Sequence, residues 1–155
     1  MMTSIDQCIV LEPVTETNFE EVFALNVTDD QRRFVASNVL SVAQAYVFKC
    51  WEPYAIRIGP TLVGFTLLYF DPAGDEPTTA SIVRFMIDRH QQRRGYGGRA
   101  MAAIVHTLRK RTGVESIELC VHPENTVARK LYESAGFSDT GRMYGYEMIY
   151  ELPLT

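Results

Sequence analysis

The sequence lacks several features that would place the protein in particular classes. No stretch approaches the ~18 consecutive apolar residues of a membrane-spanning helix, and residues 1–6 carry neither a basic region nor an apolar run, so no membrane association or secretion is expected. The three cysteines, Cys8, Cys50 and Cys120, are far apart and odd in number. They predict neither a disulfide framework nor a zinc site, and reduced thiols in a cytoplasmic protein fit best.

Signatures of several ligand classes are also absent. Neither Gly-Lys-Ser nor Gly-Lys-Thr occurs, which argues against a Walker loop. The separations of His90, His106 and His122 fit no metal motif, so no metal is expected. The net charge of −4 argues against a nucleic-acid partner and is compatible with a cationic substrate. With 155 residues, 46% of them hydrophobic, the chain is expected to form a single domain over residues 1–155.

A glycine-bearing loop is the most informative feature that is present. Residues 81–88 are β-branched and aromatic, which predicts a buried strand, and the apolar positions within 100–108 share one helical face. The loop at 90–100 lies between them, and its glycines allow the backbone to approach a ligand closely. Arg93 and Arg94 add positive charge beside the free N–H groups of a helix start. The pattern therefore predicts a phosphate-binding loop.

Two patterns narrow the kind of phosphate ligand. Gly95-x-Gly97-x-x-Ala100 formally matches a dinucleotide fingerprint, but that fingerprint needs its glycines directly after the strand, and polar residues intervene here. Read as Gln92-x-x-Gly95-x-Gly97, the loop resembles the acyl-CoA pyrophosphate loop of the GNAT superfamily of N-acetyltransferases. Residues 125–137 are similar to the second signature of that superfamily, N-x-x-A-x-x-L-Y-x-x-x-G-F, at every specified position.

The resemblance and the local patterns agree on the fold. Strands are expected at 8–11, 53–58, 62–70, 80–88, 116–121, 137–142 and 146–152, and helices within 14–49 and at 96–111 and 125–135. Within 14–49, Thr28 is expected to open a capping box closed by Gln31, and Ser41 to start a further helix. Gly64 indicates a bulge or a close backbone approach. This order implies an α/β (α+β) GNAT fold, a mixed, mostly antiparallel sheet of six to seven strands with helices on both faces.

The resemblance also implies how acetyl-CoA is held as cosubstrate. Its pyrophosphate would bind the loop formed by Gln92, Arg93, Arg94, Gly95, Tyr96, Gly97 and Gly98. The strand before the loop would diverge from the strand at 116–121 and offer backbone groups of Phe85, Met86 and Ile87, although a fully paired strand is the alternative. Asn125, a favoured N-cap residue, would also bond the pantetheine arm.

Tyr132 is implied as the general acid of a direct attack by an amine on the thioester. A phenol, with a pKa of about 10, can donate to a thiolate as it forms. Cys120 would permit an acyl-enzyme route, but a lone cysteine in an apolar strand is expected to be a core residue.

No general base is evident in the sequence. Members of this superfamily often place a carboxylate on the strand before the loop, where this chain has Ser81, Val83 and Arg84. Asp88, Glu118 and a chain of water molecules stay open as alternatives.

The amine acceptor is the least constrained expectation. Residues 26–37, 62–65 and 84–88 resemble bacterial spermine/spermidine-type acetyltransferases, which favours a small polyamine, with acidic side chains along a cleft at Glu20, Glu21, Asp29, Asp30 and Glu52. Val83 stands where such enzymes tend to carry an acid. Protein N-termini, amino acids or an antibiotic are alternative acceptors, and a non-catalytic acyl-CoA-binding regulatory module is an alternative function. The terminal hairpin would suit a homodimer.

Overall fold

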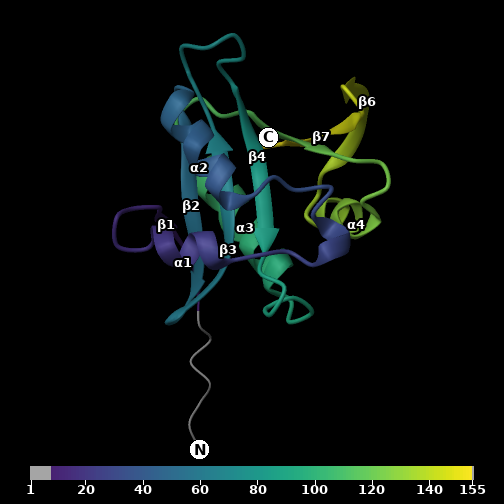
Figure 1. Ribbon diagram of the computed structural model, residues 1–155. Helices are drawn as coiled ribbons and strands as arrows, with labels where there is room; N and C mark the ends of the chain where they lie inside the picture. The colour runs from purple at the N-terminus through teal and green to yellow at the C-terminus, as the bar shows by residue number, and fades with distance from the viewer. Residues whose placement is uncertain (1–7, 155) are drawn as a thin grey trace, which may run out of the picture.

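The computed structural model describes residues 8–154, which are built around one mixed sheet (Figure 1). The seven strands in this part of the chain are β1 (Ile9–Pro13), β2 (Trp51–Ile58), β3 (Thr61–Tyr69), β4 (Thr79–Ile87), β5 (Ser116–Val121), β6 (Ser138–Tyr144) and β7 (Glu147–Pro153). They lie in the order β1-β2-β3-β4-β5-β7-β6, and only β4 and β5 are parallel. The predicted mixed, mostly antiparallel sheet is confirmed.

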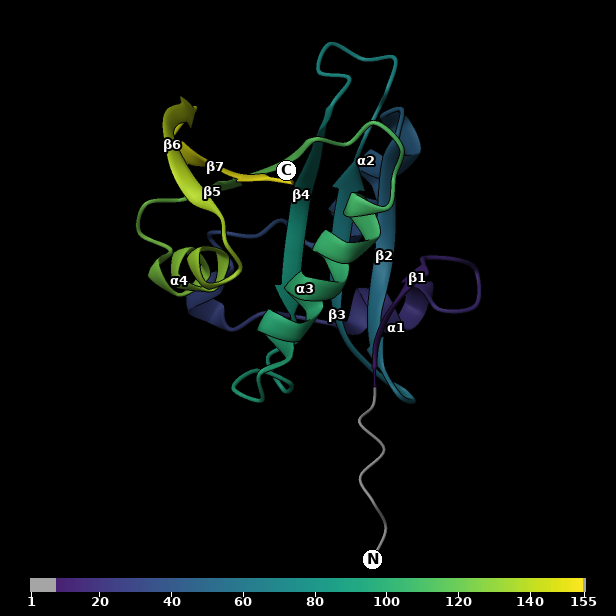
Figure 2. The same ribbon diagram turned by 180° about the vertical axis from the view of Figure 1, so that it is seen from behind.

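Helices cover both faces of the sheet, as predicted (Figures 1 and 2). The helices α1 (Phe19–Ala24) and α2 (Asn38–Val47) lie on one face, and α3 (Tyr96–Arg109) and α4 (Thr126–Ser134) lie on the other. A buried cluster fills each interface. The cluster under α1 and α2 contains Val22, Ala55, Phe65, Leu67 and Met86, and the larger one under α3 and α4 contains Ile56, Met101, Ile104, Ile117, Tyr132 and Tyr150.

The segment before α2 differs from the prediction in two places. The α2 helix begins at Asn38 because Ser37 Oγ accepts the N–H of Leu40 at 3.1 Å, so the expected start at Ser41 is wrong. Thr28 precedes a 3-10 helix, η1 (Asp29–Gln31), but its hydroxyl makes no capping bond. The expected capping box is wrong because the Gln31 side chain bonds a distant residue instead of the local backbone.

Gly64 lies both at a bulge and at a close backbone approach, the two features that a glycine within a strand indicates. The pairing of β2 with β3 shifts between Ile56 and Arg57, next to the point where Ile56 faces Gly64. A Cβ atom at Gly64 would lie 2.4 Å from the carbonyl oxygen of Met86 on β4. The close approach of β3 to β4 therefore requires glycine here, which keeps β4 in register beside β3.

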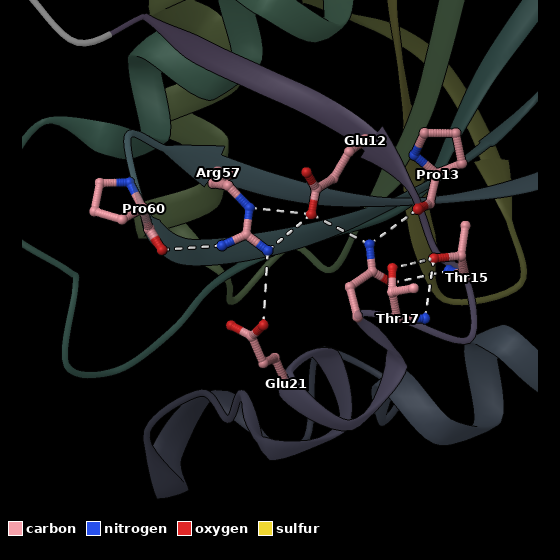
Figure 3. Close-up of polar contacts among 8 residues, drawn as sticks. Glu12, Pro13, Thr15, Thr17, Glu21, Arg57 and Pro60 are labelled. Carbon is pink, nitrogen blue, oxygen red and sulfur yellow. Dashed lines mark hydrogen bonds and ion pairs between the residues drawn. The ribbon is translucent and has the colours of Figure 1, made fainter.

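A polar network joins β1, β2 and α1 at the edge of the sheet (Figure 3). The guanidinium of Arg57 donates to Glu12 Oε1 at 2.8 and 3.0 Å and to the carbonyl of Pro60 at 3.0 Å. Asn18 Nδ2 donates to the same Glu12 oxygen at 3.2 Å. The hydrogen bonds from Arg57 lower the pKa of Glu12 below its ordinary value. This edge is therefore sensitive to protonation of one carboxylate.

Glu12→Gln is expected to make the protein less sensitive to acid. Because the folded state lowers the pKa of Glu12, its contribution to stability is present above the unfolded pKa of about 4.3 and is lost as pH falls through the folded value. The free energy of unfolding of the wild type should therefore decrease more steeply below about pH 4.3 than that of the variant. Urea unfolding between pH 3 and 7 measures this. Glu16→Gln removes an exposed carboxylate outside the network and should follow the wild type; parallel curves for all three proteins would contradict the prediction.

Candidate active site

A gap opens between the two central parallel strands. Their pairing ends at Ile82 and Leu119, although β4 continues to Ile87 and β5 to Val121. Beyond the last pair the strands diverge, and β5 and β7 turn away from the lower half of β4 (Figure 1). The predicted divergence is therefore present, and the last residues of β4 have no strand on one side.

The backbone of β4 presents alternate residues to this gap. The N–H of Asp88 donates to the carbonyl of Val63 on β3 at 2.8 Å. Backbone groups in an antiparallel ladder alternate between the two sides, so those of Ile87 and Phe85 point away from β3 and into the gap. The backbone of Met86 faces β3 instead, and its side chain is buried. Of the three predicted residues, Phe85 and Ile87 are thus the ones placed to meet a ligand in the gap.

The glycine loop presents free backbone donors. None of the N–H groups from Gln92 to Gly98 donates to another residue within 8–154. Gly95, with φ of +79°, adopts the left-handed conformation at the N-cap of α3, and Arg93 adopts it with φ of +62°. The exposed side chains of Arg93 and Arg94 pair with no carboxylate among the same residues. Consecutive free donors at a helix N-terminus beside two arginines fit a pyrophosphate.

Gln92 has a structural side chain within this loop. Its Nε2 donates to Gln31 Oε1 at 2.8 Å and to the carbonyl of Ile87 at 3.0 Å, and Gln31 Nε2 donates back at 3.3 Å. Asn26 adds a second link, since its N–H donates to Asp88 Oδ1 at 2.9 Å. The segment around η1 therefore fixes the loop, and Gln92 has only its backbone N–H left for a ligand.

The start of α4 forms the opposite wall. Asn125 Oδ1 accepts the N–H of Ala128 at 3.3 Å, which confirms the predicted N-cap. The Asn125 Nδ2 group donates to no other residue in the described range and lines a cleft. A Cβ atom at Gly97 would contact Leu131 at 3.6 Å, so α3 and α4 pack closely where Gly97 lies.

Tyr132 lies on α4 with a buried ring and an accessible hydroxyl. The ring packs near Phe137, with 6.3 Å between centroids. Its hydroxyl has no hydrogen-bond partner within residues 8–154. Every fully buried side-chain oxygen or nitrogen in this range does have a partner, so the hydroxyl of Tyr132 is not fully buried and contacts solvent. Burial and, second, the charge of Glu147 raise the pKa of Tyr132 above its ordinary value of about 10. The phenol is therefore protonated at neutral pH.

A cleft of about 310 Å³ lies between η1 and the start of α4. Asp29, Asp30 and Glu124 border it together with Arg33. Asp29 pairs with Arg32 at 3.3 Å and Glu124 with Arg33 at 2.8 Å, both at the exposed surface. The sequence had indicated Asp29 and Asp30, but it gave no signal for Glu124 and Arg33, which are 91 residues apart. The acids are therefore supplied by both sides of the cleft.

The other predicted acids on the acceptor side lie elsewhere. Glu52 pairs with Arg111, just beyond the end of α3, at 2.5 Å. Glu21 approaches Arg57 at 3.8 Å within the edge network, and Glu20 makes no ion pair among the described residues. Neither Glu52 nor Glu21 lines the cleft.

Both carboxylates considered as bases are engaged in the fold. Asp88 is buried and accepts the N–H groups of Asn26 and His90, at 2.9 and 3.2 Å. Glu118 pairs with Arg142 at 2.6 Å. Asp88 thus uses both carboxylate oxygens within the fold, and Glu118 uses Oε1 in its ion pair.

Cys120 is exposed, so its expected place in the core is wrong. The inward residues of β5 are Ile117, Leu119 and Val121, and alternation along a strand turns Cys120 to the other face. Desolvation, together with the charges of Glu147 and Glu118, raises the pKa of its thiol. A thiol that keeps its proton is a poor nucleophile for an acyl-enzyme route.

Comparison with known protein families identifies the family of this chain. Residues 17–137 match the family model described as "Acetyltransferase (GNAT) family". The chain belongs to the GNAT acetyltransferase family. It is therefore an acyltransferase that uses acetyl-CoA, and the predicted superfamily, fold and cosubstrate are confirmed.

Two curated relatives from Bacillus subtilis match most of this GNAT chain. A probable spermine N(1)-acetyltransferase of subspecies natto (strain BEST195) is 27% identical over 138 residues, covering 87% of this chain and 91% of the relative. A spermine/spermidine N(1)-acetyltransferase of strain 168 is 26% identical with the same coverage.

Solved structures share the fold at lower sequence identity. An aminoglycoside acetyltransferase, AAC(6′)-Ib, in complex with coenzyme A matches with a TM-score of 0.78 at 18% identity, covering 94% of this chain and 95% of the other. A spermidine N-acetyltransferase from Vibrio cholerae, in complex with CoA and spermine, matches with a TM-score of 0.71 at 15% identity and the same coverage.

Residues 8–154 contain neither a metal-binding cluster nor a membrane-spanning helix. No group of three or more histidine, cysteine or acidic side chains in this range could hold a metal ion. No helix there has both the length and the apolar character needed to cross a bilayer.

Removing the loop arginines is expected to weaken coenzyme A binding. Charge-assisted hydrogen bonds to phosphate are strong, so Arg93→Asn with Arg94→Ala should raise the dissociation constant at least tenfold, about 1.4 kcal/mol, in calorimetry. Asparagine is chosen at position 93 because it tolerates a positive φ. Lys110→Ala, just beyond the far end of α3, is the control and should bind as the wild type does. Equal affinity for coenzyme A in all three proteins would show that the pyrophosphate does not bind to this loop.

Proposed function

We propose that this GNAT acetyltransferase transfers the acetyl group of acetyl-CoA to a primary amine of a small polyamine such as spermidine or spermine. The observation that carries the proposal is the acidic cleft, where the three carboxylates of Asp29, Asp30 and Glu124 outnumber the one arginine of the lining, Arg33. A polyamine carries several ammonium groups, and carboxylates on both walls suit the groups that do not react. The likeness to the two Bacillus subtilis relatives over 87% of the chain supports the same acceptor class.

The residues around the gap would each bind a different part of acetyl-CoA. Acetyl-CoA supplies an acetyl thioester. The backbone N–H groups from 92 to 98 and the side chains of Arg93 and Arg94 hold its pyrophosphate. The pantetheine arm follows the gap, where the backbone of Phe85, the N–H of Ile87 and the amide of Asn125 offer hydrogen bonds. This places the thioester between β4 and α4, within reach of an amine entering from the cleft.

Tyr132 is the group that assists departure of the thiolate. Its hydroxyl is protonated, has no partner among the described residues and contacts solvent. A phenol is a weaker acid than an aliphatic thiol, whose pKa is about 8.5, so the hydrogen bond stabilises the thiolate as its charge develops. The phenol proton then passes to sulfur when the acylated nitrogen releases its own second proton.

Assembly and location complete the proposal. The β6 strand forms the free edge of the sheet and is largely exposed, which would allow a second copy of the chain to pair there. The thiols of Cys50 and Cys120 form no disulfide, as expected in the cytoplasm. Homodimerisation and a cytoplasmic location both stay predictions.

The acceptor is tested by a thiol-release assay with acetyl-CoA and a panel of polyamines, monoamines, amino acids, peptides and aminoglycosides. Spermidine or spermine should react best, and the rate should fall as salt screens the cleft. Asp29→Asn with Asp30→Asn should raise the Michaelis constant for spermidine several-fold more than that for a monoamine. The double variant Glu16→Gln with Glu20→Gln removes the same charge outside the cleft and should change neither. Polyamines that do not react while another class does would contradict the acceptor assignment alone.

Tyr132→Phe tests the proposed acid. The change keeps the ring that packs near Phe137 and removes only the hydroxyl, so kcat should fall about 10²-fold, a typical scale for general acid catalysis. The Michaelis constant for acetyl-CoA and the thermal midpoint should change little. Phe137→Leu alters the packing around the same ring and should lower the thermal midpoint with a smaller effect on kcat. Turnover close to the wild-type value in Tyr132→Phe would leave Tyr132 as a packing residue.

A further inference from the structure

The proposed reaction needs a group that removes a proton from the acceptor. An alkyl ammonium has a pKa of about 10.4, so only about one molecule in 2,500 is a neutral amine at pH 7. Asp88 and Glu118 are both held by hydrogen bonds or an ion pair within the fold. This proton must therefore pass to another group near the gap or to a chain of water molecules.

Glu147 occupies a suitable place as the first residue of β7. Cys120 faces Ile149 and Val121 faces Met148, so this end of β7 lies beside the end of β5 that borders the gap. Met148 and Tyr150 pack into the core under α3 and α4, and alternation therefore directs Glu147 to the opposite face. That face is the one on which α1, α2 and the segment with η1 lie.

The surroundings leave Glu147 without a counter-charge. It is half-buried, and no Lys, Arg or His among residues 8–154 forms an ion pair with it. The nearest arginine on the hairpin, Arg142, is engaged by Glu118 at 2.6 Å. A partly desolvated carboxylate without a cation attracts one from outside.

Two groups near Glu147 are affected by its charge. Desolvation raises the pKa of Cys120 and of Tyr132, and the charge of Glu147 adds to the shift in both. Cys120 lies on the same face of the sheet as Glu147, opposite Ile149 of β7. No sequence motif marks this residue, since it follows a turn near the end of the chain.

We propose that Glu147 is a catalytic residue that binds the reacting ammonium of the acceptor and accepts one of its protons. This inference rests on the proposed function. The ammonium transfers one proton to the Glu147 carboxylate, and the nitrogen lone pair forms the N–C bond to the thioester carbon. The C–S bond breaks, the sulfur takes the proton of Tyr132, and the acylated nitrogen returns its second proton to the Tyr132 oxygen. Glu147 then releases its proton to water.

Other titratable groups lie near Glu147, and their protonation also affects how the activity depends on pH. They are Cys120 and Glu118 on β5, Tyr132 on α4, Tyr144, which pairs with Glu147 on β6, and His122, which follows Val121, the β5 partner of Met148. Glu118 is engaged by Arg142, so Glu147 is the carboxylate of this set that is free to exchange a proton with the acceptor.

Glu147→Gln tests the inference with any amine that the wild type acetylates. At pH 7, kcat/KM should fall at least 100-fold, because only the rare neutral amine then reacts. The deficit should shrink about tenfold per pH unit as pH rises from 8 toward the pKa of the amine. Glu147→Asp should restore part of the activity, and the Michaelis constant for acetyl-CoA should stay within about threefold of the wild-type value.

Glu151→Gln is the matched control. Glu151 lies on the same strand and the same face, four residues farther from the gap, and its replacement should leave the kcat/KM and its pH profile within twofold of the wild type. Near wild-type kcat/KM in Glu147→Gln would overturn the inference, as would a deficit that stays constant with pH. A wild-type enzyme that acetylates no amine would instead overturn the proposed function and this inference with it.

Discussion

The short parallel pairing of β4 with β5 is the constraint on which the site depends. Only the residues up to Ile82 and Leu119 are paired, and both strands then continue without each other. Backbone N–H and C=O groups strongly favour hydrogen-bonded partners, so the unpaired end of β4 is a place where an extended ligand can bond in place of a strand. The helices α3 and α4 both pack on one face, in a single buried cluster that takes residues from strands on either side of the gap.

The segment around η1 connects the two sides of that gap. Toward β4, Gln31 exchanges amide hydrogen bonds with Gln92 of the glycine loop. Toward α4, Arg33 pairs with Glu124. These links fix the loop with its backbone donors unpaired and form the acidic cleft at the same time. The glycine loop and the wall of the acidic cleft are thus parts of one connected structure.

The distribution of charge follows the same division. The cosubstrate side carries Arg93, Arg94 and a helix N-terminus, all of which favour phosphate. The acceptor side carries unneutralised or surface-paired carboxylates, of which Glu147 has no cation partner in the described part of the chain. Most other carboxylates near the sheet, such as Glu118, are paired with arginines that hold strands or helices together. Within a net charge of −4, the glycine loop and the cleft therefore carry charge of opposite sign.

The sequence by itself determined the elements whose signals are local. The strand at 116–121, the N-cap at Asn125 and the glycine loop were all predicted where the structure has them, because each depends on residues a few positions apart. Only the tertiary structure decided the bond of Gln31 to a residue 61 positions away and the exposure of Cys120. It also placed Glu147 beside the end of β5, on the side away from β4. These depend on which face of the sheet a helix covers and on which distant segment reaches a side chain, and no short-range pattern encodes either.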